Sequence, residues 1–75
     1  MKVTIHRTDN QVYVDGLARS IDCSALASYI DVIQWDTDHR DGWIEFVNDG
    51  RGAFNPNVKI VYLAPYRSFI DNWAL

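Results

Sequence analysis

Short runs of alternating apolar and polar residues make up most of the chain and predict a sheet. Residues 2–7, 11–14 and 42–47 alternate with a period of two, the side-chain period of a strand with one buried face. Residues 58–63 return as a further extended segment. Because Gly, Asn and Asp separate most of these runs, we expect strands linked mainly by turns.

The dipeptide Asp15-Gly16 is the strongest local signal in the sequence. Both central residues of a type I′ turn need positive φ, and Asp-Gly between two alternating runs suits that turn. A two-residue turn here places Val14 opposite Leu17. The sequence therefore predicts a β-hairpin closed at these two residues.

A second turn is expected at Asp9-Asn10. If it also has two residues, Ile5 lies opposite Val14, and Arg7 lies opposite Val12. The first three strands then form a meander with one buried face. That predicted face consists of Val3, Ile5, Val12, Val14 and Leu17.

Residues 29–35 are apolar on both sides of an extended chain. Ile30 and Val32 share one predicted face, and Ile33 and Trp35 share the other. A strand with two apolar faces is covered on both sides. We therefore place this segment near the centre of the sheet.

The C-terminal residues change to the period of a helix. Pro65 suits the first helical position. A helix of about 11 residues is not stable alone in water, so we expect it to dock on the sheet. Its apolar stripe consists of Tyr66, Phe69, Ile70, Trp73 and Ala74.

Together these elements predict an α+β fold. We expect an antiparallel sheet of about four to five strands, arranged as a β-meander, with one C-terminal helix packed on it. With 75 residues, the chain has room for a single domain, residues 1–75. Residues 48–57 are rich in Gly and Asn and form the main predicted loop.

Composition narrows the range of functions. The net charge is −3, and the seven basic residues are dispersed, which argues against binding to a nucleic-acid duplex. A single-strand site could still use aromatic residues with a few cations, so nucleic acid is an unfavoured partner but not an excluded one. No apolar run approaches the roughly 18 residues of a membrane span, and residues 1–10 read as a strand instead of a signal peptide. Cys23 is the only cysteine, and we interpret it as a reduced, half-buried hydrophobe. These features indicate synthesis in a reducing cytoplasm, without membrane association.

Few side chains offer chemistry, and none forms a recognised catalytic or metal-binding pattern. Asp36, Asp38 and Asp41 suggest a calcium loop, but the Gly and Glu that such a loop needs at its sixth and twelfth positions are missing. His6 and His39 have no evident nucleophilic or acidic partner. We therefore expect no enzyme activity, no cofactor and no metal site.

Aromatic residues are more abundant than a one-sided sheet under a short helix needs, although core and rim packing is an alternative explanation. Exposed aromatic patches mark binding surfaces, and free strand edges can pair with a partner. Homo-oligomerisation through either surface would increase the burial of so small a domain. The candidate interaction surface consists of Tyr13, Tyr29, Trp35 and Trp43.

The order of several short segments resembles small proteins encoded in the tail or tail-fibre regions of bacteriophages and prophages. The resemblance spans nearly the whole chain. The segments that carry it are VYVDG (12–16), IDCSAL (21–26), VIQWD (32–36), GWIEFV (42–47) and APYRSFIDNW (64–73).

The resemblance implies a setting and transfers no catalytic residue or cofactor. It implies a virion accessory component or a tail-fibre assembly factor that acts through protein–protein contacts with a tail or fibre protein. Such a protein would be made in the cytoplasm of a host bacterium and, as a component, would end in the virion. The alternative is a small phage-encoded regulatory protein that binds a host protein or nucleic acid.

Overall fold

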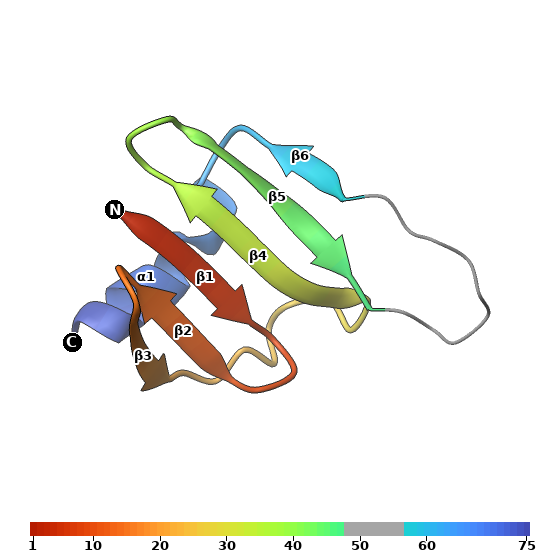
Figure 1. The fold of residues 1–75 in the computed structure, drawn as a ribbon. Helices are drawn as coiled ribbons and strands as arrows, with labels where there is room; N and C mark the ends of the chain where they lie inside the picture. The colour runs from red at the N-terminus through yellow and green to blue at the C-terminus, as the bar shows by residue number, and fades with distance from the viewer. Residues whose placement is uncertain (48–56) are drawn as a thin grey trace.

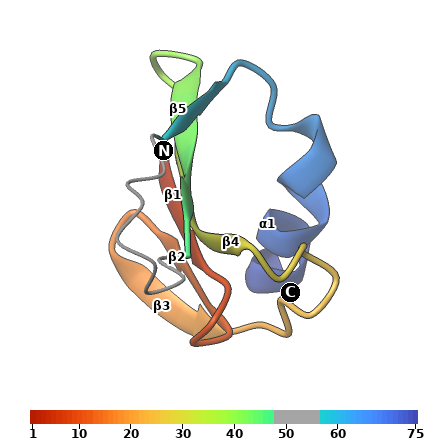
Figure 2. The same ribbon diagram turned by 90° about the vertical axis from the view of Figure 1, so that its right-hand side faces the viewer.

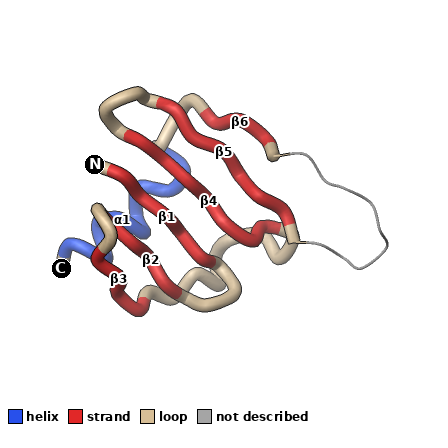
Figure 3. The backbone as a smooth tube through the Cα atoms, in the orientation of Figure 1, coloured by secondary structure: helices blue, strands red, loops and turns tan. Residues whose placement is uncertain are grey.

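The computed structural model describes residues 1–47 and 57–75 and shows one antiparallel sheet with a C-terminal helix (Figures 1 and 3). All but the last residue of the predicted loop 48–57 lie outside the described residues. The strands are β1 (Lys2–His6), β2 (Gln11–Val14), β3 (Leu17–Ser20), β4 (Ile30–Asp36), β5 (Asp41–Phe46) and β6 (Val58–Ile60). A 3-10 turn, η1 (Ala64–Tyr66), leads into the helix α1 (Arg67–Ala74).

The described sheet has six strands in the order β3-β2-β1-β4-β5-β6, so the predicted count of four to five is too low. The strand beyond the predicted count is β6, a three-residue segment at the edge of the sheet that pairs with β5 alone. The prediction of a meander is correct for β1 to β3 and for β4 to β6, because consecutive strands are neighbours within each of these two groups. The two groups join because β4 returns to pair with β1.

The Asp15-Gly16 hairpin is confirmed. Asp15 has a φ of 50° and Gly16 a φ of 85°, and Val14 pairs with Leu17. The two-residue turn at Asp9-Asn10 is wrong. The turn spans residues 7–10, and its last residue, Asn10, has a φ of 51°.

The longer turn shifts the β1–β2 register by two residues, so Ile5 pairs with Val12 and Val3 with Val14. Asn10 holds the turn through contacts distant in sequence, since its carbonyl accepts from Ile21 N at 3.0 Å and its side-chain oxygen from Cys23 N at 2.9 Å. A shift by two preserves the face of every side chain. Val3, Ile5, Val12 and Val14 are therefore buried as predicted in spite of the wrong register.

β4 lies in the interior of the sheet, as predicted, but its faces differ from the prediction. Ile30 pairs with Phe46 and Val32 with Glu45, across an irregularity between Ile30 and Val32. Because Phe46 and Glu45 are consecutive and point to opposite faces, Ile30 and Val32 do so as well. The local bulge thus moves Ile30 to the side of Ile33.

One face of the sheet is covered. Figure 2 shows α1 and the chain between β3 and β4 on the same side of the sheet. The predicted helix stripe contacts this face through Phe69, which is buried, and through Tyr66, Ile70 and Trp73, which are partly buried. Cys23 is completely buried there, not half-buried, because it belongs to the segment between β3 and β4 and packs into the core cluster. The other buried residues of the core cluster are Val3, Ile5, Val12, Val14, Ile30, Ile33 and Trp35.

Polar contacts fasten α1 to the edge strand β3. The guanidinium of Arg19 lies 4.5 Å from the ring centroid of Trp73 and donates to the carbonyls of Trp73 and Leu75. Trp73 Nε1 donates to the Leu17 carbonyl at 2.9 Å. The Leu17 side chain itself is 66% exposed, so its predicted burial is wrong. The Trp73 indole of α1 and the Arg19 guanidinium of β3 pack together at this edge instead.

Trp35 and Gly42 form a tight contact at the covered face. They are cross-strand partners, and a Cβ added to Gly42 would lie 2.9 Å from Trp35 Cε3 and 2.1 Å from the Gln34 carbonyl oxygen. A side chain has no room there. The glycine lets the indole pack against the backbone of β5.

Candidate interaction surface

The second face of the sheet has no covering element within the described residues, since α1 and the 21–29 segment lie on the opposite side (Figure 2). Side chains from β1, β4 and β5 form a regular grid on it, because the strand registers align them in three rows. The first row is Lys2, Asp36 and Asp41, the second is Thr4, Gln34 and Trp43, and the third is His6, Val32 and Glu45. We call these nine residues the open-face grid.

Trp43 is the largest side chain of the grid and is 42% exposed. Its Nε1 donates to Glu45 Oε2 at 3.0 Å, which fixes the orientation of the ring on the sheet. A fixed aromatic ring loses little conformational entropy on binding and exposes a large apolar area. Trp43 is therefore the natural anchor residue of this face.

A hollow of about 340 Å³ lies beside Trp43. Its floor contains Gln34, whose Oε1 accepts from Thr4 Oγ1 at 2.6 Å. The hollow brings charges of both signs around one aromatic ring. Its lining residues are Lys2, Gln34, Trp35, Asp36, Asp41 and Trp43.

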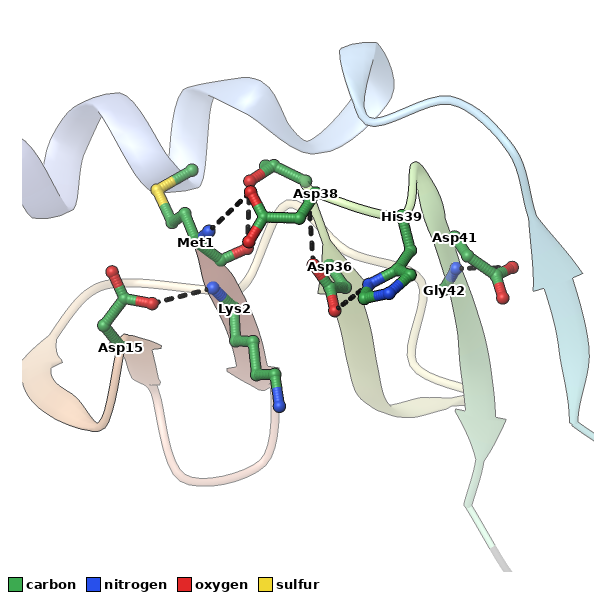
Figure 4. Close-up of polar contacts among 9 residues, drawn as sticks. Met1, Lys2, Asp15, Asp36, Asp38, His39, Asp41 and Gly42 are labelled. Carbon is green, nitrogen blue, oxygen red and sulfur yellow. Dashed lines mark hydrogen bonds and ion pairs between the residues drawn. The ribbon is translucent and has the colours of Figure 1, made fainter.

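The polar contacts at the end of the sheet are shown in Figure 4. Asp36 accepts from His39 Nδ1 at 2.8 Å and from Asp38 N at 2.9 Å. These hydrogen bonds, that of His39 above all, hold the pKa of Asp36 below its ordinary value. Asp38 in turn lies 3.6 Å from the N-terminal ammonium of Met1.

The other acidic residues of the grid also have partners. Asp41 lies 3.4 Å from Lys59 Nζ and accepts from Gly42 N at 3.0 Å, and Glu45 accepts from the Trp43 indole. The open face thus carries fixed, paired charges around Trp43 instead of an isolated acidic cluster.

The structure separates the residues of the predicted interaction surface. Tyr13 and Trp43 lie on the open face, where Tyr13 packs edge-on against His6 with ring centroids 5.4 Å apart. Trp35 is only 6% exposed and belongs to the covered face. Tyr29 is 63% exposed in the turn before β4, and its ring lies 5.8 Å from that of Phe46.

Sequence reasoning identified the aromatic residues and missed the charged members of the grid. The signal for them was present in the alternation, since Lys2 and Glu45 follow the same period as Thr4 and Trp43. What the pattern lacked was the register between distant strands. The β1–β4 pairing is what brings Lys2 beside Asp36.

The remaining candidates for chemistry are dispersed. In the part of the chain that the structure describes, no three His, Cys, Asp or Glu side chains form a group that could hold a metal ion. Burial, together with the nearby Asp22 carboxylate, raises the pKa of the Cys23 thiol, which disfavours the nucleophilic thiolate. None of the described helices is long and apolar enough to cross a membrane.

No model of a known protein family matches the chain, and comparisons with curated proteins and with solved structures found no match either.

Proposed function

We propose that the chain is a protein–protein interaction module that binds through the open-face grid and has no catalytic activity of its own. The observation that carries the proposal is the asymmetry of the sheet. The core and α1 cover one face, whereas the other presents Trp43 beside a hollow within the described residues. Aromatic anchors surrounded by polar groups are the usual centre of a protein interface.

The setting that we propose is the tail region of a bacteriophage or prophage. The sequence resemblance supports it, from VYVDG (12–16) to APYRSFIDNW (64–73). In this setting the chain is a virion accessory component or a tail-fibre assembly factor. It would be made in the cytoplasm of the host bacterium.

Affinity capture with the tagged chain, from a lysate of bacteria in which the phage or prophage is expressed, tests both parts of this proposal. The wild-type chain should recover a tail or fibre protein, or further copies of itself if it is such a component. The variant Trp43→Ala should lose what it recovers, because it lacks the anchor. Tyr62→Ala is the matched control, since Tyr62 is a 75% exposed aromatic residue outside the grid.

The possible outcomes test the proposed binding surface and the proposed phage setting separately. Equal capture by wild type and Trp43→Ala would contradict the proposed binding surface. Trp43-dependent capture of a host enzyme, without any phage protein, would support the surface and contradict the setting. That last result would instead favour the regulatory alternative.

A further inference from the structure

The charged residues of the open-face grid are segregated by strand. β1 contributes Lys2 and His6, whereas β5 contributes Asp41 and Glu45. β4 runs between these two strands and pairs with both of them. Within the grid, the basic residues therefore lie on one side of β4 and the carboxylates of β5 on the other, where Lys59 of the flanking strand β6 lies 3.4 Å from Asp41.

This arrangement is complementary to itself. If a second copy is placed face to face by a two-fold axis that runs along β4, β1 of one copy lies over β5 of the other. Such an axis places each row of one copy over the same row of the other. Lys2 therefore meets Asp41 in the first row, and His6 meets Glu45 in the third. An isologous interface makes every such contact twice.

The middle strand and the middle row also fit this arrangement. Val32, which is only 7% exposed, lies on the axis, and Gln34 meets Gln34, an amide that can both donate and accept. Trp43 lies over Thr4, which is small enough to leave space for an indole. The two hollows beside Trp43 then face the opposite sheet.

From this pattern we infer that the partner of the open face is a second copy of this chain, bound as a face-to-face two-fold dimer. The inference rests on the proposed function, because it requires that the open face binds protein. Within the grid, Asp36 is the charged residue that meets its own like charge. It lies at the end of the face, where His39 and Asp38 already donate hydrogen bonds to it.

The size of the face sets the strength of the dimer. The three strands of the grid and one flanking strand on each side, spaced about 4.8 Å apart, with rows spaced about 6.8 Å apart, cover roughly 500 Å² on each copy. Stable interfaces bury about 800 Å² on each partner. The dimer is therefore weak, and association appears at concentrations of roughly 0.1–1 mM.

Charge exchange between two variants tests the inference. Lys2→Glu sets a carboxylate over Asp41 at both symmetry-related contacts of its own dimer, and Asp41→Lys sets two cations together at the same contacts. In a mixture of the two variants both contacts become attractive. Sedimentation equilibrium should show each variant alone associating at least about tenfold more weakly than wild type, and the equimolar mixture associating about as strongly as wild type.

The matched controls change net charge by the same amounts on the helix. Arg67→Glu and Asp71→Lys alter exposed residues of α1, on the other side of the sheet. Each control should associate as wild type does, and mixing them should change nothing. Circular dichroism of all four variants checks that each one is folded.

A wild-type chain that stays monomeric at 1 mM overturns the second-copy inference. So does a mixture of Lys2→Glu and Asp41→Lys that associates no better than its components. Either result leaves the proposed function standing as long as Trp43→Ala abolishes capture of a different protein. Conversely, capture that does not depend on Trp43 removes the proposed function and this inference together.

Discussion

Trp35 and Trp43 lie in neighbouring strands of the same sheet and have opposite surroundings. Trp35 packs over Gly42 in the core and is 6% exposed, whereas Trp43 is 42% exposed beside a hollow on the open face. The same residue type therefore serves two purposes in one sheet. The covered face contains the folding core, and the open face is the surface that we propose for binding.

The largest expected effect comes from substituting each tryptophan in turn. Trp35→Ala should cost about 3–5 kcal/mol of the free energy of unfolding, because it leaves a cavity in the core. A domain of this size has a total stability of the order of 5 kcal/mol, so this variant should be mostly unfolded. Trp43→Ala should cost about 1 kcal/mol, because its ring is only partly buried.

Urea denaturation followed by circular dichroism measures both variants without relying on tryptophan fluorescence. Comparable losses of stability would contradict the division between the two faces. They would mean that Trp43 belongs to the folding core.

Substitution of Gly42 tests the packing of Trp35 on the covered face without changing the tryptophan itself. Gly42→Ala places a Cβ against the Gln34 carbonyl and the Trp35 ring, so strands β4 and β5 must separate locally. We expect a loss of about 2 kcal/mol from this overpacking. Gly16→Ala is the control, since Gly16 has a φ of 85° with open space around it, and should cost about 1 kcal/mol through backbone strain alone.

Thermal unfolding of the two glycine variants gives the order of these effects. A Gly42→Ala variant at least as stable as Gly16→Ala would mean that Trp35 is not packed tightly on β5.

The parts of this fold that could be predicted from sequence are those determined by neighbouring residues. Asp15-Gly16 specifies its turn by its own φ preferences, and the existence of α1 follows from a local period. The predicted start of the helix at Pro65 is wrong, because Pro65 lies in the 3-10 turn that precedes α1. The turn at residues 7–10 was predicted too short because Asn10 is held by Ile21 and Cys23, which are distant in sequence.

The candidate site was predictable only in its residue types. Alternation assigned Tyr13 and Trp43 to strands, but neither the covering of Trp35 nor the bulge at Ile30 is encoded by a local pattern. The charge segregation of the grid depends on β4 lying between β1 and β5. That order requires the return of the chain across the covered face, which no adjacent residues specify.

The contact between Arg19 of β3 and the end of α1 predicts a smaller loss of stability. Arg19→Ala removes the guanidinium from the Trp73 ring and from the last carbonyls of the helix, and should cost about 1 kcal/mol. Arg19→Lys should recover part of this loss, because an ammonium keeps the charge but not the planar stacking. Arg67→Ala, on the exposed side of the helix, should change stability little.

Chemical denaturation in low and high salt tests this contact. Equal stability of Arg19→Ala and wild type would show that the Arg19 guanidinium does not help to hold the helix on the sheet.

The smallest expected effect concerns acid stability at the end of the open face. The pKa of Asp36 in the folded chain lies below its ordinary value of 3.8, so its contribution to stability is complete above that pH. It is lost as the pH falls through the lower, folded-state pKa. Asp36→Asn should therefore reduce the acid dependence of unfolding in this range, and His39→Ala should do the same by removing the main donor.

Urea midpoints measured between about pH 2 and pH 5 follow this contribution. An unchanged acid dependence in both variants would mean that the His39–Asp36 hydrogen bond does not persist in solution.

Fluorine NMR of the chain labelled with 5-fluorotryptophan tests the central claim, that the open face binds protein, most directly. The chain has three tryptophans, and single substitutions assign the three signals. We expect the Trp43 signal alone to shift strongly as a captured partner, or a rising concentration of the chain itself, fills the open face. Binding that leaves the Trp43 signal unchanged and moves that of Trp35 or Trp73 instead would contradict this claim.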